Sequence, residues 1–82
     1  MYHLYILECA DFSLYTGITV DLDRRLEEHN TSKLGARYTS IRRPVKLVYS
    51  ASFANRSLAS KEEYRIKQLS REEKLELIKG KK

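Results

Sequence analysis

The segment after the single proline alternates with a strict period of two, and this pattern restricts the fold more than any other feature of the chain. Beyond Pro44, one set of side chains points to one side and the intervening set to the other. The first set is Val45, Leu47, Tyr49, Ala51 and Phe53, and the second is Lys46, Val48, Ser50 and Ser52. A period of two is the repeat of a β-strand with one face toward a core, so we expect a strand over residues 45–53.

Two short runs near the N-terminus predict a β-hairpin. Residues 2–9 and 13–18 are rich in Tyr, Leu and Ile, and residues 10–12 between them suit a turn. Asp11 is typical of such a turn, whereas Phe12 is not, so the register of the two strands stays open.

A first helix is expected over residues 20–30. Thr19 offers a hydroxyl for its N-cap, and Asp21 and Asp23 place negative charge in its first turn, where the helix dipole favours it. Leu22 and Leu26 define the side of this helix that faces the core.

Two more helices are expected after the third strand. Helical spacing over residues 56–69 predicts one, with an apolar stripe of Leu58, Ala59, Ile66 and Leu69. Ser70 and Glu73 then form a capping box for a last helix, which carries Leu75 and Ile78 inward and ends at Gly80.

These elements follow the order β-β-α-β-α-α, with a long polar and basic loop from Thr31 to Pro44 before the third strand. They predict an α/β (α+β) fold with a small three-stranded antiparallel sheet flanked by helices. At 82 residues the chain is long enough for one domain over residues 1–82 and too short for two.

The charge and the cysteine content narrow the class of protein. A formal charge of +5 favours an anionic partner but does not separate nucleic acid from acidic lipid or protein. Cys9 is the only cysteine, which excludes an intramolecular disulfide; we interpret it as a buried structural thiol in a protein of the reducing cytoplasm. The chain lacks a signal-peptide pattern and any apolar run near the roughly 20 residues that span a bilayer, so neither export nor membrane insertion is expected.

Arg25 and His29 interrupt the apolar stripe of the first helix beside Leu22 and Leu26. A half-buried guanidinium needs a partner, and phosphate is a natural ligand for its fork. The alternatives are that Arg25 extends out to solvent from the edge of the stripe and that His29 only interacts with the helix dipole. By the same helical spacing Arg24, Glu27 and Glu28 are ordinary solvent residues.

Glu62 and Glu63 border the stripe of the second helix, with Glu62 nearer its centre. A carboxylate at this margin is a usable ligand for a hard cation such as Mg²⁺. The simpler interpretation, which the residues alone favour, is a surface pair between Glu63 and Lys67 at i,i+4 spacing.

The chain resembles the GIY-YIG endonuclease family. The resemblance rests on Leu4-Tyr5-Ile6-Leu7, on Tyr15-Thr16-Gly17 ten residues after Tyr5, on Arg25 and His29, and on Ala59-x-x-x-Glu63. The strings Tyr15-Thr16-Gly17-Ile18-Thr19, His29-Asn30 and Arg42-Arg43-Pro44-Val45 are similar to small stand-alone bacterial members. The chain departs from the signature in two places, because the first triplet reads His3-Leu4-Tyr5 without its glycine and Thr16 replaces isoleucine.

The resemblance implies a site that hydrolyses phosphodiester bonds with one divalent ion, Mg²⁺ or Mn²⁺, held by Glu63. It also implies that Arg25 donates to the phosphate, that Tyr5 is the general base, and that Tyr15 and His29 orient water or assist proton transfer. Because an unperturbed tyrosine with a pKa near 10 is a poor base at pH 7, Arg25 and the ion must lower the pKa of Tyr5. Gly17 is expected where a side chain would crowd the substrate or the start of the helix, or it is purely structural.

The basic loop then has an expected role along a sugar-phosphate backbone. The residues concerned are Lys33, Arg37, Tyr38, Arg42, Arg43 and Lys46. For any single one of them, a solvated surface position is an equal alternative.

We therefore expect a metal-dependent nuclease acting on nucleic acid, with DNA as the favoured substrate, in repair or in the processing of unusual structures. The alternatives are a binding module of the same fold that does not cut, and a small protein-interaction domain whose charge is incidental. The sequence offers no residue that indicates an oligomeric state.

Overall fold

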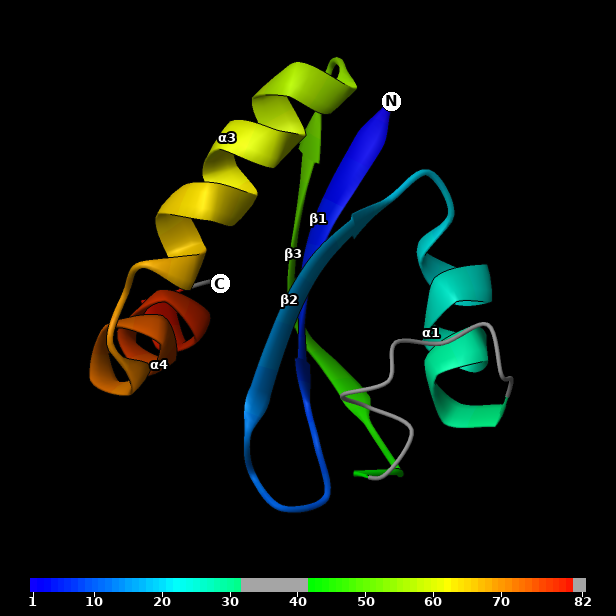
Figure 1. The fold of residues 1–82 in the computed structure, drawn as a ribbon, viewed down its shortest axis with the longest axis vertical. Helices are drawn as coiled ribbons and strands as arrows, with labels where there is room; N and C mark the ends of the chain where they lie inside the picture. The colour runs from blue at the N-terminus through cyan, green and yellow to red at the C-terminus, as the bar shows by residue number, and fades with distance from the viewer. Residues whose placement is uncertain (32–41, 81–82) are drawn as a thin grey trace.

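The computed structural model describes residues 1–31 and 42–80, which form three strands and three helices (Figure 1). In chain order these are β1 (Tyr2–Glu8), β2 (Leu14–Thr19), α1 (Leu22–Thr31), β3 (Lys46–Phe53), α3 (Arg56–Lys67) and α4 (Arg71–Gly80). The expected order β-β-α-β-α-α is confirmed. All three strands lie in one antiparallel sheet, with β1 between β2 and β3.

The hairpin between β1 and β2 has the register that the sequence left open. Tyr5 lies opposite Gly17, and Leu7 lies opposite Tyr15. In the turn, Asp11 Oδ1 accepts the backbone N–H of Ser13 at 3.0 Å, and Phe12 takes a left-handed φ of 67°. A positive φ is uncommon for a bulky residue, which is why Phe12 did not match a typical turn pattern.

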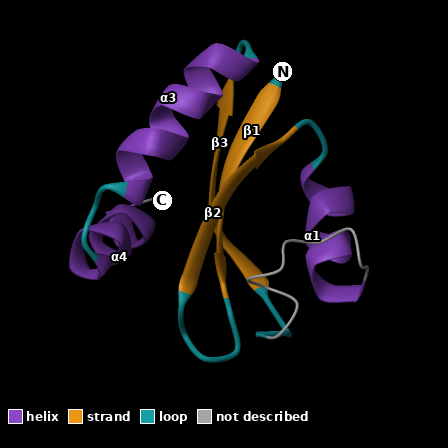
Figure 2. Cartoon of the chain, in the orientation of Figure 1, coloured by secondary structure: helices purple, strands orange, loops and turns teal. Residues whose placement is uncertain are grey.

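The sheet separates two layers of helix, with α1 against one face and α3 and α4 against the other (Figures 1 and 2). The α1 face is the side on which Tyr5, Leu7 and Cys9 of β1 and its extension pack, with Leu22 and Leu26 against them. The α3 face is the opposite side, where Leu4, Ile6 and Ile66 are fully buried. The central strand is therefore buried on both faces, and the expected burial of Cys9 is confirmed.

The predicted alternation of the third strand is wrong in one respect, because the strand contains an irregularity. Ile6 pairs with Tyr49 but Leu7 pairs with Leu47, so Val48 is an extra residue between the two pairs. Such a bulge reverses the faces of the residues on either side of it. Val45 consequently packs on the α1 face, whereas Tyr49 and Phe53 pack on the α3 face, and Leu47 is 39% exposed.

The cap predicted for α1 is also corrected. Asp21, not Thr19, caps the helix, because Asp21 Oδ1 accepts the backbone N–H of Arg24 at 3.1 Å. The Thr19 hydroxyl instead accepts the N–H of Asp21 at 3.2 Å. Thr19 thus orients the capping residue, and the helix begins two residues later than expected.

The ends and inner sides of α3 and α4 match the expectation in part. The capping box is confirmed: the Ser70 hydroxyl accepts the backbone N–H of Glu73 at 3.1 Å, and the Glu73 carboxylate accepts that of Ser70 at 2.9 Å. Leu58 and Leu75, expected inside, are 44% and 39% exposed, and Leu77 packs on the α3 face instead of Leu75. Two helices that share one face of a three-stranded sheet cannot both cover every apolar side chain.

Candidate active site

Tyr5 enters the α1 face from the middle of β1, and its ring lies against the backbone of Gly17 on the neighbouring strand. A Cβ at position 17 would lie 2.5 Å from Tyr5 Oη and 2.7 Å from its Cζ. Only glycine leaves room for the ring at this point. Gly17 is therefore required by the ring of Tyr5, which agrees with the purely structural alternative, and its predicted place beside the substrate stays a prediction.

His29 projects from the last turn of α1 and is completely buried. Its Nε2 lies 3.0 Å from the Tyr5 hydroxyl. Its ring also lies 5.2 Å from the ring of Tyr15 and 5.8 Å from that of Tyr5, while the two tyrosine rings are 6.5 Å apart. The structure thus brings together three residues that the sequence singled out from three different elements.

Burial determines the charge of both members of the Tyr5–His29 pair. It lowers the pKa of His29 from 6.5 to about 4, with help from the positive charges of Arg25 and Arg43 and against the negative charge of Glu28. Burial also raises the pKa of Tyr5 above 10, although hydrogen bonding to Arg25 opposes this. Arg25 acts on the pKa of Tyr5 in the expected direction, because it lowers it. Burial raises this pKa by more, so the net shift in the protein without a bound ion is upward. Near pH 7 the pair is a neutral phenol beside a neutral imidazole.

Arg25 connects this buried pair to the surface. Its side chain is 27% exposed, hydrogen bonds with Tyr5, and forms an ion pair of 3.0 Å from Nη1 to Glu28 Oε1. Glu28 was expected to be an ordinary solvent residue, but it also pairs with Arg24 at 3.2 Å, and hydrogen bonding from Arg25 lowers its pKa. The i,i+3 and i,i+4 spacings were the signal for these pairs in the sequence.

A hollow of about 210 Å³ opens beside Arg25 at the start of α1. It is lined by Thr19, Val20, Asp21, Arg24, Arg25 and Glu28. The polar cluster, which we define as Tyr5, Tyr15, Arg25 and His29, therefore reaches solvent through a guanidinium. This arrangement suits the binding of an anion next to a neutral hydrogen-bonding pair.

Glu63 lies on α3 and has the partner that the residues alone favoured. Its Oε2 is 3.1 Å from Lys67 Nζ, and its side chain is 23% exposed. It is near enough to the polar cluster for its negative charge to raise the pKa of Tyr5. Within residues 1–31 and 42–80, no group of three or more His, Cys, Asp and Glu side chains is placed to hold a metal ion. The role of Glu63 as a metal ligand therefore stays a prediction.

The described cations of the basic loop and of β3 all have partners within the protein. Arg42 Nε pairs with Asp11 at 3.0 Å, and Lys46 pairs with Glu8 at 3.4 Å. Arg43 Nε donates to the backbone oxygen of His29 at 2.6 Å. Their predicted contacts with nucleic acid stay predictions, and Lys33, Arg37 and Tyr38 lie outside the described residues.

Asn30 has a structural part that sequence reasoning missed. Its side chain accepts the backbone N–H of Val45 and donates to the backbone oxygen of Val45. The only signal in the sequence was the resemblance of the strings His29-Asn30 and Arg43-Pro44-Val45 to small family members, which does not reveal that the two strings meet.

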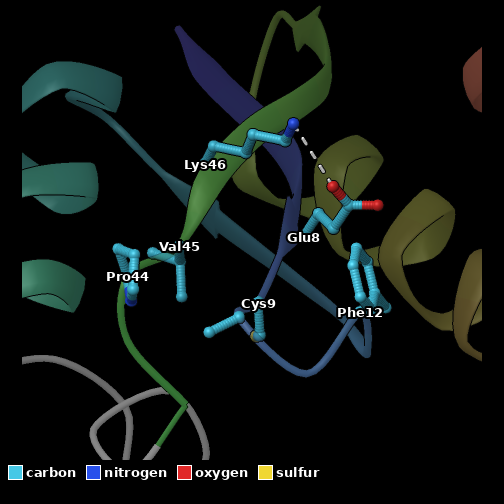
Figure 3. Close-up of a pocket in the computed structure, with 7 residues that line it drawn as sticks. Glu8, Cys9, Phe12, Pro44, Val45 and Lys46 are labelled. Carbon is cyan, nitrogen blue, oxygen red and sulfur yellow. Dashed lines mark ion pairs between the residues drawn. The ribbon is translucent and has the colours of Figure 1, made fainter.

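A second hollow, of about 230 Å³, lies at the other end of β1 and shares no residue with the polar cluster (Figure 3). Cys9, Val45 and Phe12 form part of its wall, and the ion pair between Lys46 and Glu8 lies at its edge. Phe12 is 66% exposed. The hollow is mainly apolar, and the charged groups in its lining, Glu8 and Lys46, are paired with each other.

Comparison with known proteins identifies the family of the chain. The GIY-YIG catalytic domain matches residues 1–76. A UPF0213 protein of Desulfotalea psychrophila is 57% identical over 77 residues, which cover 94% of this chain and 70% of that protein. A UPF0213 protein of Halobacterium salinarum is 51% identical over 74 residues, which cover 90% of this chain and 95% of that protein.

Solved structures agree with this match. The solution NMR structure of a UPF0213 protein from Bacillus halodurans is 45% identical, with a TM-score of 0.64, and the match covers 99% of this chain and 86% of that one. In the described part of the present chain, no helix combines the length and the apolar composition needed to cross a bilayer. The resemblance noted from the sequence is confirmed, and the chain belongs to the GIY-YIG family, whose members are generally endonucleases.

Proposed function

We propose that the protein hydrolyses phosphodiester bonds in nucleic acid, with DNA as its substrate and one Mg²⁺ or Mn²⁺ ion as its cofactor. The observation that carries this proposal is the convergence of Tyr5, Tyr15, Arg25 and His29 on the α1 face, from three separate elements. Phosphodiester hydrolysis needs an activated water, a cation against the phosphoryl oxygens and support for the leaving oxygen. The polar cluster supplies the first two.

Arg25 is the proposed phosphate ligand. Its guanidinium borders the 210 Å³ hollow and is held by Glu28 at 3.0 Å, so its orientation is set before substrate arrives. A planar guanidinium matches a phosphate with two parallel hydrogen bonds, which a lysine cannot form. The positive charge of the chain, +5, favours the approach of a polyanion.

Tyr5 and His29 form the proposed proton route. Because the pKa of His29 is about 4, its imidazole is neutral near pH 7, and in the tautomer that carries its proton on Nδ1 the Nε2 atom accepts a hydrogen bond from the Tyr5 hydroxyl at 3.0 Å. We propose that the proton of this hydrogen bond moves to Nε2 only as the attacking water gives up its own proton. As the Tyr5 proton passes to Nε2, the Tyr5 oxygen takes the proton of the attacking water. The tyrosine is then neutral again and the imidazole carries the positive charge, while the water oxygen bonds to phosphorus and the bond from phosphorus to the leaving oxygen breaks. The leaving oxygen departs as an alkoxide and takes a proton from solvent, and the imidazolium returns its extra proton to solvent. This route removes the need for a free phenolate at the start of the reaction.

Glu63 is the proposed metal ligand. Mg²⁺ prefers oxygen ligands, keeps several waters and is often held by one or two carboxylates together with substrate phosphate, so a single carboxylate fits it. When bound, the ion would supply positive charge next to the reacting phosphate. Lys67 holds Glu63 at 3.1 Å in the protein alone, and this lysine must give way to the cation.

The experiment is cleavage of DNA and RNA panels by wild type, Glu63→Gln and Arg25→Lys, with Mg²⁺ or EDTA. We expect cutting only with metal, and a loss of about 10²–10³-fold in each variant. Glu62→Gln is the matched control, because Glu62 is the adjacent carboxylate and pairs with Arg65 instead. Equal activity in Glu63→Gln and wild type would show that another site, or a contaminant, does the cutting.

The ion pair between Glu63 and Lys67 favours a second candidate function, a nucleic-acid-binding module that does not cut. Such a module would bind DNA with an affinity that falls steeply with salt. It would show neither metal-dependent cleavage nor any effect of Glu63→Gln on binding.

A further inference from the structure

We infer that Asn30 and Arg43 are positioning residues, which hold His29 beside Tyr5 by tying the last turn of α1 to the segment that enters β3. The hydrogen bonds concerned join residues 14 and 15 positions apart in the chain. The effect on turnover rests on the function proposed above, whereas the effect on His29 itself does not.

Asn30 joins α1 to the segment that enters β3, because its side-chain amide pairs with the backbone of Val45 as a neighbouring strand would. Its Oδ1 accepts the backbone N–H of Val45 at 2.7 Å, and its Nδ2 donates to the backbone oxygen of Val45 at 3.0 Å. An amide is the side chain that can donate and accept in this way, whereas a carboxylate would only accept. Val45 is 5% exposed and belongs to the cluster around Tyr5, so the bond ties α1 to the core of the α1 face.

Arg43 contacts the same last turn of α1 through its guanidinium. Its Nε donates to the backbone oxygen of His29 at 2.6 Å, and its Nη2 donates to that of Glu28 at 3.4 Å. The last carbonyls of a helix have no partner within the helix, and a cation there also interacts favourably with the helix dipole. Arg43 thus acts on the backbone of His29 itself.

Arg42, the neighbouring arginine, has a different partner, although the sequence did not distinguish it from Arg43. Arg42 pairs with Asp11, whose side chain is 51% exposed, at the tip of the hairpin. Surface pairs of this kind contribute little to a fold. Arg42 and Arg43 therefore form a matched pair: among the hydrogen bonds between described residues, those of the Arg43 side chain reach the turn that carries His29, and that of the Arg42 side chain reaches Asp11.

With its own backbone held by Arg43 and the next residue held by Asn30, His29 keeps its ring in the buried position 3.0 Å from Tyr5. The other described groups that act on the ring include Tyr15 of β2, Arg25 and Glu28 of α1, and the positive charge of Arg43 itself. If the last turn of α1 loosens, water reaches the imidazole and its distance to Tyr5 lengthens. A shift of about 1 Å in a reacting group is enough to lower a rate by about 10²-fold.

The test is an NMR titration of the His29 imidazole in wild type and four variants. We expect a midpoint near pH 4 in wild type, and a midpoint at least one unit higher in Arg43→Ala and Asn30→Leu. Arg43→Lys keeps the positive charge but loses the two contacts of the guanidinium with the backbone of α1. Its midpoint is expected to lie between those of wild type and Arg43→Ala, and its shift from wild type measures the effect of position without the effect of lost charge. Arg42→Ala is expected to leave the midpoint unchanged. The signals of His3, on β1, report whether each variant is folded.

Steady-state kinetics of DNA cleavage provide a second measurement of the positioning role. Arg43→Lys is expected to lower kcat at least tenfold with little change in KM. An unchanged His29 midpoint in folded Arg43→Lys would overturn the inference, because a shift in Arg43→Ala alone would report only the lost positive charge, which itself lowers the pKa of His29. An equal shift in Arg42→Ala would also overturn it. If wild type cuts no DNA, the proposed function fails, but the titration still decides the positioning role. If Asn30→Leu does not fold, the two Arg43 variants decide it.

Discussion

The two faces of the sheet use burial for different purposes. On the α3 face, Leu4, Ile6 and Ile66 are fully buried and apolar. On the α1 face, burial of the same completeness surrounds His29, with Tyr5 against it. Both faces receive side chains from one strand, β1, because successive residues of a strand point to opposite sides.

The difference shows where stability and reactivity come from in so small a protein. Each fully buried aliphatic side chain of the α3 face contributes about 1.5–3 kcal/mol from removal of apolar surface from water. Burial of an imidazole instead penalises its charged form, and that penalty keeps His29 neutral near pH 7. We therefore expect the buried aliphatic side chains of the α3 face to determine mainly stability and the α1 face to determine mainly phosphate binding and proton transfer, with Glu63 of α3 as the one exception, because it is the proposed metal ligand.

The strongest test of this division is Ile66→Ala on the α3 face. Removing a fully buried isoleucine side chain is expected to lower the free energy of unfolding by about 2–5 kcal/mol, measured by urea denaturation. Cleavage per folded molecule is expected to stay close to wild type. Leu58→Ala, on the same helix but at a position 44% exposed, is the control and should cost much less. A change in kcat of folded Ile66→Ala would break the division between the faces.

The pH dependence of stability tests the α1 face. The pKa of His29 is lower in the folded protein, about 4, than its ordinary 6.5, so between these values the unfolded chain binds the extra proton. Stability is fully present above about pH 6.5 and falls as the pH drops, by up to about 1.4 kcal/mol per unit, until about pH 4. Urea denaturation at several pH values should show a shallower slope over this range in His29→Gln. An unchanged slope in His29→Gln would show that a group other than His29 takes up the proton on unfolding.

Gly17→Ala sharpens the comparison at the point where Tyr5 crosses β2. The added Cβ would lie 2.5 Å from Tyr5 Oη, so the ring must move, at a cost of about 1–3 kcal/mol. Because Tyr5 also leaves its place beside His29, cleavage should fall more than stability does. Gly80→Ala is the control, since a Cβ there meets nothing within 4 Å. Full activity in Gly17→Ala would mean that the position of the Tyr5 ring is not needed.

The smallest effect is expected at the start of α3. Asn55 Oδ1 accepts the backbone N–H of Leu58 at 3.0 Å, and Asn55→Ala should lower the free energy of unfolding by about 1 kcal/mol. Asn55→Asp keeps the accepting oxygen and should cost less. A loss in Asn55→Ala as large as that in Ile66→Ala would show that the cap, and not packing on the α3 face, holds this helix.

Much of the fold could be predicted because its signals are local. The alternation from Tyr49 to Phe53, the capping box of Ser70 and Glu73, and the helical stripe through Ala59 and Ile66 each lie within a few residues and follow from backbone geometry. The same local patterns failed where a distant partner intervenes. The extra residue in β3 is set by its pairing with β1, and the exposure of Leu58 depends on how much of α3 the sheet can cover.

The candidate site divides in the same way. The sequence by itself determined which residue types stand at positions 5, 15, 25, 29 and 63, and with them the family. Only the tertiary structure decided that His29 lies against Tyr5, 24 positions away, and that Arg43 holds the turn carrying His29 while Arg42 pairs with Asp11. The physical reason is that pKa values and hydrogen-bond partners depend on burial and on distances between side chains, and these distances exist only once the sheet has brought the elements together.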